Sequence, residues 1–142
     1  MKRLLILYLL PYFMQCKQPP QATLQIWNDI AEGHYQICAK TFNIDMDLAK
    51  NYFLYLYLPD ERPFHCFIKC IYDRVHFLTS EGDFDPEVVV NKVHFLSQEI
   101  VDKCIQEIHH FTDSCKKAYV GGTCAIAYLM EMDRQELTIR KT

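Results

Sequence analysis

The residues with the most specific chemistry in this sequence are its seven cysteines, spread through a chain of 142 residues. One of them, Cys16, lies in the N-terminal segment, and the other six lie between positions 38 and 124. An even number of cysteines in an oxidising compartment predicts a disulfide framework, although the count alone leaves the pairing open. The six are Cys38, Cys66, Cys70, Cys104, Cys115 and Cys124.

The spacing of these cysteines limits which of them can pair. Cys66 and Cys70 are four residues apart, so in a helix both sulfurs lie on one face. Cys115 and Cys124 are nine residues apart, which in a helix turns their side chains to opposite faces. The last helix is therefore expected to offer one sulfur to each of two neighbours, and a bond between Cys115 and Cys124 is disfavoured.

The N-terminus predicts export of the chain. Lys2 and Arg3 precede an apolar run over residues 4–14, which is shorter than the roughly 20 residues that a bilayer-spanning helix needs. A basic start followed by such a run is typical of a signal peptide. We therefore expect a signal peptide over residues 1–16, whose removal discards Cys16. The mature protein is expected to be secreted, extracellular and without a membrane span.

The composition excludes several classes of protein. Half of the residues are hydrophobic and 13% are aromatic, which is incompatible with a disordered chain. The formal net charge is −3 and the basic residues form no run, so we expect no nucleic-acid partner. Only four Gly and six Pro are present, which favours helices over a turn-rich sheet.

Helical periodicity and capping signals divide the rest of the chain. Asp45, Asp85 and Ser97 each stand in an N-cap position before an apolar stretch with a period near that of a helix. These signals predict one all-α domain over residues 17–132, followed by a polar C-terminal tail over 133–142. The expected helices span about 23–37, 46–56, 60–78, 86–96, 97–111 and 114–132.

Six histidines raise the question of a metal site or a pH switch. His109 and His110 are adjacent, so their side chains diverge on a helix, and we expect no metal site. A histidine that is buried and neutral has a lowered pKa in the folded state, so that folding loses stability as the pH falls. The candidates for such a switch are His76, His94, His109 and His110, and the alternative is that they lie exposed on helix surfaces.

No motif in the sequence has the geometry of a catalytic site. The three serines after the signal segment, Ser80, Ser97 and Ser114, do not lie in a Gly-x-Ser-x-Gly turn. Cysteines that are held in disulfides cannot act as nucleophiles. We therefore expect a protein that is not an enzyme and that needs no cofactor.

The cysteine pattern resembles that of the insect odorant-binding proteins, the pheromone-binding and general odorant-binding proteins. Three residues separate Cys66 from Cys70, and eight separate Cys115 from Cys124. The order and spacing of all six cysteines fit the six-cysteine subgroup of that family. The run Asp-Ser-Cys-Lys-Lys-Ala-Tyr at residues 113–119 is similar to the start of the family's last helix.

The resemblance implies an all-α fold of about six helices that enclose an apolar pocket and are held by three interlocked disulfides. Gly121 and Gly122 depart from the family pattern, because they interrupt the last predicted helix. Each glycine costs a helix about 1 kcal/mol relative to alanine. This pair is expected to soften one wall of the pocket. The disulfides that the resemblance implies are Cys38–Cys70, Cys66–Cys115 and Cys104–Cys124.

By the same resemblance, the protein is a carrier that takes up small hydrophobic ligands reversibly and delivers them to a chemosensory receptor. The ligands would be odorants, pheromones, tastants or lipids, and the carrier would be a monomer or a weak homodimer. The alternatives are a lipid carrier outside chemosensation and a secreted protein that acts through protein contacts. The latter rests on residues 52–58, Tyr-Phe-Leu-Tyr-Leu-Tyr-Leu, which as a helix would need burial in the domain or in a partner.

The apolar residues expected to line the pocket come from the third to the sixth predicted helix, and ordinary core packing is the alternative for each. They are Phe67, Ile68, Tyr72, Val89, Val93, Leu96, Ile100, Ile108, Phe111, Tyr119, Tyr128 and Leu129. Tyr52, Tyr72, Tyr119 and Tyr128 are candidates to orient a ligand carbonyl or hydroxyl group through a hydrogen bond. The alternative for each is a hydroxyl that reaches solvent or a backbone carbonyl.

Overall fold

The computed structural model describes residues 21–139 and the side chains of residues 22–131. The predicted signal peptide, with Cys16, lies outside the described residues. Within the described chain every regular element is helical, apart from one isolated β-bridge between Leu78 and Phe84. The elements are α1 (Gln21–Ala31), the 3-10 turn η1 (Glu32–His34), α2 (Tyr35–Phe42), α3 (Met46–Tyr55), α4 (Arg62–Arg74), α5 (Pro86–Lys92), α6 (Gln98–Ile108) and α7 (Ser114–Ile139).

The prediction of an all-α fold is confirmed, and all three predicted N-caps are found. Asp45, Asp85 and Ser97 accept hydrogen bonds from backbone N–H groups in the first turns of α3, α5 and α6. At the C-terminal ends of α2 and α3, Asn43 and Leu56 adopt left-handed conformations, with φ of 54° and 52°. A left-handed residue at this position ends a helix.

Several helix ends differ from the prediction. The first predicted helix is divided by η1 into α1 and α2. α4 ends at Arg74, four residues early, because the chain folds back there and Leu78 pairs with Phe84. The ammonium group of Lys92 donates to the carbonyl oxygen of Val75 at 2.6 Å, which satisfies a group beyond the helix end.

The last three helices also end elsewhere than expected. α5 ends at Lys92 and α6 at Ile108, each a few residues before the predicted end. The backbone of α7 continues to Ile139, into the segment predicted as a polar tail. That segment contains arginine, glutamine, glutamate and leucine, which are good helix formers, so its polarity did not indicate the end of the helix.

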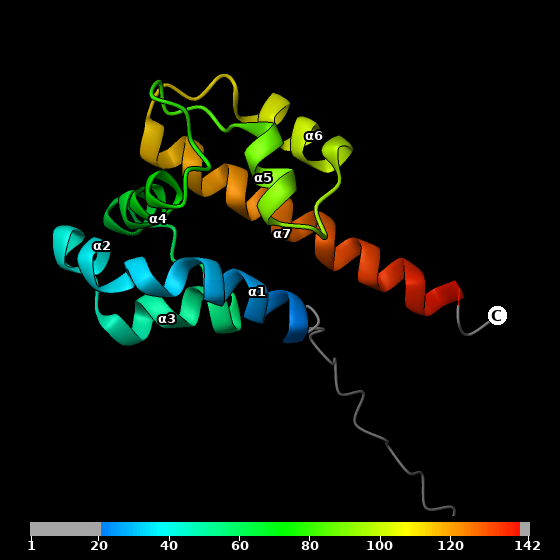
Figure 1. The fold of residues 1–142 in the computed structure, drawn as a ribbon, viewed down its shortest axis with the longest axis horizontal. Coiled ribbons are helices and arrows are strands. Elements are labelled where there is room, and N and C mark those ends of the chain that lie inside the picture. Colours follow the sequence, from blue (N-terminus) through cyan, green and yellow to red (C-terminus); the bar gives the residue numbers. More distant parts are fainter. Residues whose placement is uncertain (1–20, 140–142) are drawn as a thin grey trace, which may run out of the picture.

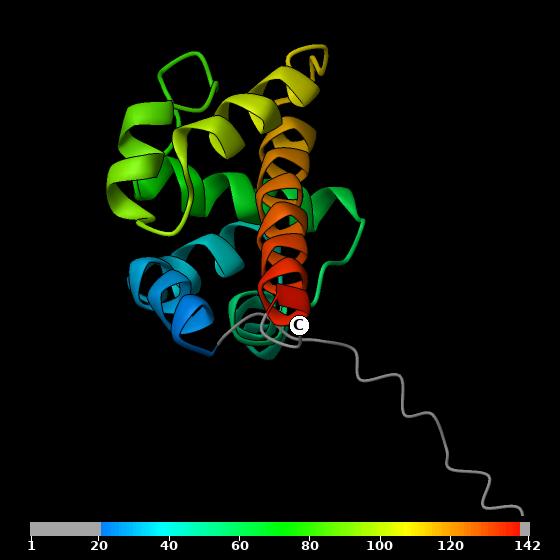
Figure 2. The same cartoon turned by 90° about the vertical axis from the view of Figure 1, so that its right-hand side faces the viewer.

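The helices form two groups joined by α4 and α7. Figures 1 and 2 show α5 and α6 on one side of the molecule and α1, α2 and α3 on the other, with α4 between them and α7 reaching across both. α7 packs against α4 and α6, while α2 packs against α4 and α1 against α3. No helix within residues 21–139 is long and apolar enough to cross a membrane.

Three disulfides fix this arrangement. Cys38–Cys70 joins α2 to α4, Cys66–Cys115 joins α4 to α7, and Cys104–Cys124 joins α6 to α7. These are the pairs that the resemblance implied. The two cysteines of α7 bond to different neighbours, as their opposite faces predicted. The predicted helical fold with three interlocked disulfides is therefore confirmed.

We expect the disulfides to differ in their contribution to stability. Cys66–Cys115 spans 49 residues and Cys104–Cys124 spans 20. In the chain-entropy model, loss of the longer link costs about 4 kcal/mol and loss of the shorter about 3 kcal/mol. Urea unfolding of the double variants Cys66→Ala/Cys115→Ala and Cys104→Ala/Cys124→Ala, followed by circular dichroism, measures both. Equal or reversed losses would contradict this expectation.

Candidate ligand-binding cavity

An apolar cavity lies among α1, α3, α4, α5, α6 and α7. The space open to the centres of water molecules is about 60 Å³, several times the ~15 Å³ that one water needs. Its lining is almost entirely aliphatic and aromatic, without a charged side chain. The lining residues are Trp27, Ile30, Ala31, Phe53, Ile71, Tyr72, Val75, Phe77, Phe84, Val89, Val93, Leu96, Val101, Cys104, Ile105, Ile108, Gly121, Gly122 and Ala125.

Five of the twelve residues predicted to line a pocket lie in this wall: Tyr72, Val89, Val93, Leu96 and Ile108. They belong to α4, to α5 and the segment that follows it, and to α6. That any of them contacts a ligand stays a prediction.

The other seven predicted residues do not line the cavity: Phe67, Ile68, Ile100, Phe111, Tyr119, Tyr128 and Leu129. Phe67 and Ile68 are fully buried in the core. Phe111 follows α6 and lies beside the ring of His110, with centroids 4.3 Å apart. Tyr128 lies under the ammonium group of Lys103, 5.9 Å from its ring centroid. Helical periodicity predicted that these residues lie on apolar helix faces, but it did not indicate which neighbour each one contacts.

Most of the wall was missed from the sequence. α1 contributes Trp27 and Ile30, although the first helix was not expected to reach the pocket. Phe77 and Phe84 come from the chain reversal after α4, where the bridge of Leu78 to Phe84 brings the two phenylalanines to the same wall. No local periodicity could have indicated this reversal.

The two glycines of α7 have a packing role that the sequence did not show. A Cβ atom on Gly121 would lie 2.5 Å from the ring of Phe84, and one on Gly122 would lie 2.3 Å from the hydroxyl oxygen of Tyr72. Such distances are shorter than any real carbon contact. The glycines therefore let two aromatic rings approach the helix backbone, and the pair fixes the position of this wall rather than merely softening it.

Two buried tyrosines share a hydrogen bond at this wall. The hydroxyl oxygens of Tyr52 and Tyr72 are 3.1 Å apart, and either can donate. Burial raises the pKa of Tyr72 to about 12 and that of Tyr52 well above its usual value, so both phenols stay protonated at physiological pH. Of the other candidates, Tyr119 donates to the carbonyl oxygen of Leu58 at 3.1 Å, which is the alternative foreseen for it.

The residues proposed for a pH switch are exposed, so that hypothesis is wrong for His76, His94, His109 and His110. The buried histidine among the described side chains is His65, on α4, with 6% of its surface exposed. No group of three or more His, Cys, Asp or Glu within the described side chains could hold a metal ion.

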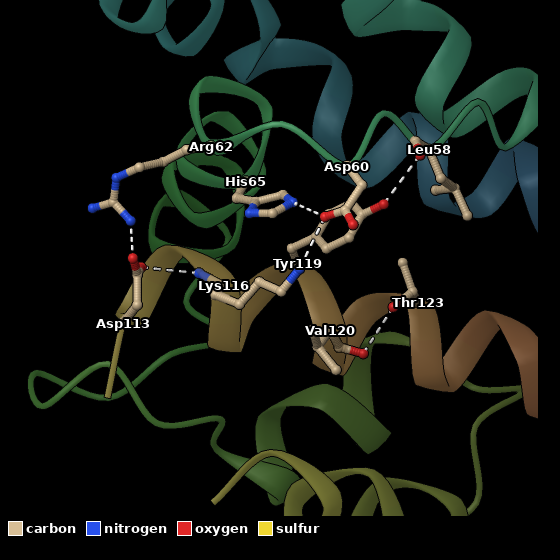
Figure 3. Close-up of polar contacts among 9 residues, drawn as sticks. All are labelled: Leu58, Asp60, Arg62, His65, Asp113, Lys116, Tyr119, Val120 and Thr123. Carbon is tan, nitrogen blue, oxygen red and sulfur yellow. Dashed lines mark hydrogen bonds and ion pairs between the residues drawn. The ribbon is translucent and has the colours of Figure 1, made fainter. Parts of the chain in front are cut away.

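His65 belongs to a polar cluster that attaches the segment before α4 to α7 (Figure 3). Its ring stacks on that of Tyr119, with centroids 4.1 Å apart, and its Nε2 atom lies 2.8 Å from a carboxylate oxygen of Asp60. Lys116 of α7 donates to the same oxygen at 2.9 Å. Burial lowers the pKa of His65, and the hydrogen bond to Asp60 opposes this shift only in part.

The helices, held by three disulfides, surround an apolar cavity of the kind in which proteins bind small molecules. The sequence profile of the PBP/GOBP family matches residues 13–128, and the chain belongs to this family. The family consists of binding and carrier proteins, and the resemblance to insect odorant-binding proteins is thereby confirmed.

One relative from Drosophila melanogaster is named general odorant-binding protein 99b. The two sequences are 29% identical over 100 residues, which span 61% of this chain and 64% of the relative. The match therefore covers less than two thirds of that protein. No solved structure matches the chain significantly.

We expect Gly122→Ala to destabilise the protein. An alanine in the helix gains about 1 kcal/mol, but overpacking against Tyr72 costs about 1–3 kcal/mol. Gly33→Ala is the control, because a Cβ atom there has no neighbour within 4 Å. Thermal unfolding should show a lower midpoint for Gly122→Ala and an unchanged or higher one for Gly33→Ala. A Gly122→Ala variant as stable as the wild type would refute the packing role.

His65 should make stability depend on pH. Because its pKa is lowered on folding, the unfolded chain binds more protons as the pH falls through the usual histidine value of about 6.5. The free energy of unfolding should therefore decrease below that pH. Urea unfolding between about pH 7.5 and 5 should show a smaller decrease for His65→Gln, whereas exposed His94→Gln should behave as the wild type. The same decrease in all three proteins would show that His65 is not responsible.

Proposed function

We propose that this protein is a secreted carrier that binds small hydrophobic ligands reversibly in the cavity between its helices and delivers them to a chemosensory receptor. The observation that supports this proposal most directly is the uncharged, apolar cavity. Its wall includes Cys104, one half of the disulfide that joins α6 to α7. Apolar surface of a ligand that leaves water for such a wall gains about 25 cal/mol per Å² before the costs of binding. Membership of the PBP/GOBP family supports the same function.

Secretion is part of this proposal, and its support is chemical. Three disulfides persist only in an oxidising compartment, which for most organisms means the exterior or the secretory pathway. The apolar run after Lys2 and Arg3 supplies the export signal that such a location requires.

The dimensions of the cavity favour small ligands over long-chain lipids. The space open to the centres of water molecules is about 60 Å³, so a compact molecule needs less rearrangement of the helices than a long acyl chain would. For this reason we favour volatile or similarly small ligands over the alternative of a lipid carrier.

The alternative of a function through protein contacts has less support. In residues 52–58, Tyr52 and Phe53 are buried within the domain, and the helix ends at Tyr55. Tyr55 and Tyr57 are exposed by 63% and 57%, but each lies alone between half-buried leucines. The apolar side chains of residues 52–58 are therefore largely buried within the domain itself.

Binding of a fluorescent apolar probe, such as N-phenylnaphthylamine, tests the proposal directly. The oxidised protein without its signal peptide should bind about one probe per chain in the apolar cavity. Ala125→Phe places a ring in the cavity wall and should weaken probe binding at least several-fold. Ala127→Phe, two residues along α7 at an exposed position outside the lining, is the matched control and should bind as the wild type.

Two results would contradict the carrier function. One is the absence of saturable probe binding by a protein with native helicity and three intact disulfides. The other is equal probe affinity in the wild type, Ala125→Phe and Ala127→Phe, which would place the binding elsewhere on the molecule.

A further inference from the structure

The cavity has one boundary that no disulfide crosses. α1 contributes Trp27 and Ile30 to the wall, but its backbone packs mainly against α3 and makes little contact with α5, α6 or α7. By contrast, two disulfides hold α4, α6 and α7 together. α1 contains no cysteine, so it can move relative to these three helices without breaking a covalent bond.

The burial of the lining limits where a ligand can enter. A route between the cavity and the solvent has to pass residues that reach both, and most of the lining side chains are fully buried. Five lining residues are only partly buried. Phe84 comes from the chain reversal after α4, and the other four lie on α1, α6 and α7: Trp27, Ile30, Ile105 and Ala125.

An aromatic contact closes the boundary beside α1. The ring of Trp27 packs against that of Phe95, with centroids 5.7 Å apart, and both side chains are half-buried. Phe95 belongs to the connection between α5 and α6, residues 93–97, which Figure 2 shows extending toward α1. Val93 and Leu96 of this connection are buried and line the cavity, whereas Phe95 does not line it. Phe95 therefore contacts the wall without contacting the space inside.

We propose that Trp27 and Phe95 form a gate, so that ligands enter and leave the cavity between α1 and the connection of α5 to α6 when the two rings separate. This inference rests on the proposed carrier function and names the route by which the cavity exchanges its ligand.

The chain reversal after α4 is the rival route, and it is held more firmly. Backbone hydrogen bonds of 2.7 and 2.8 Å join its two arms. The ammonium group of Lys117 on α7 donates to a carboxylate oxygen of Asp83 at 2.6 Å. The ring of Phe84 occupies the space beside Gly121. Displacement of the reversal breaks several polar contacts, whereas separation of Trp27 from Phe95 breaks one apolar contact.

A gate of this kind controls rates rather than affinity. The two rings are in contact in the closed protein, whether or not a ligand is inside, so loss of the contact favours opening equally in both states. The association and dissociation rate constants then rise by the same factor, and their ratio, the Kd, is unchanged. Removal of one aromatic pair should raise opening about two- to tenfold.

Stopped-flow fluorescence of N-phenylnaphthylamine with the oxidised protein, without its signal peptide, measures both rate constants. Phe95→Ala should raise each of them about two- to tenfold and leave the Kd within about twofold. Phe95→Leu retains an apolar side chain without the ring and should raise both by a smaller factor. Phe111→Ala is the matched control, because Phe111 is a half-buried phenylalanine outside the lining, and both rate constants should be unchanged. Circular dichroism and thermal unfolding establish that each variant is folded.

Phe84→Ala distinguishes the two routes. Because Phe84 is part of the wall, its truncation should raise the dissociation rate constant and weaken probe binding, with the association rate constant unchanged. A larger rise of the association rate constant in Phe84→Ala than in Phe95→Ala would place the entry at the chain reversal and overturn the gate.

The remaining outcomes separate this inference from the function on which it rests. If the probe binds but Phe95→Ala and Phe95→Leu leave both rate constants unchanged, the carrier function stands and the gate is wrong. Weaker binding by Phe95→Ala through the dissociation rate constant alone would show that Phe95 holds the ligand, which also contradicts the gate. If the wild type does not bind the probe, the carrier function itself fails, and the gate with it.

Discussion

The structure depends on a covalent constraint: α7 is bonded to a different helix on each of two faces. Cys115 joins it to α4, and Cys124 joins it to α6. In most domains the distance between helices is set by side chains that fill the space between them at crystal-like density. Here the helices on both sides of α7 are held by disulfides, so the interior can contain an unfilled volume without the walls collapsing or separating.

The second constraint is the absence of side chains at one turn of α7. Gly121 and Gly122 lower the intrinsic stability of the helix, yet the rings of Phe84 and Tyr72 occupy the space that they leave. The ring of Tyr72 in turn brings its hydroxyl to that of Tyr52. A local weakness in helix propensity is thus compensated by aromatic packing and by a buried polar contact.

Much of the fold could be predicted from the sequence because its determinants are local or chemically distinctive. Asp45, Asp85 and Ser97 act within a single turn, so their caps are visible in the sequence. The disulfide pairing followed only from the resemblance to a known family, because the spacing alone excluded one pair and left the others open. The end of α7 was missed because helix-forming polar residues give no signal for termination.

The cavity was harder to predict because it depends on contacts between distant segments. Helix periodicity identifies an apolar face but not its neighbour, so Phe67 and Ile68 were expected at the pocket and lie in the filled core instead. Trp27 and Phe84 reach the wall through the tertiary arrangement of α1 and of the chain reversal after α4. The roles of His65 and of the glycine pair likewise required knowledge of what each one contacts.

The distribution of the disulfides also determines how the cavity can deform. Part of its wall is formed by α4, α6 and α7, which the cross-links join into a single frame. Three other helices of the wall, α1, α3 and α5, contain no cysteine. A guest larger than the resting volume will therefore displace the helices without cross-links, including α1, where Trp27 meets Phe95, while the cross-linked frame and Tyr72 on α4 keep their positions.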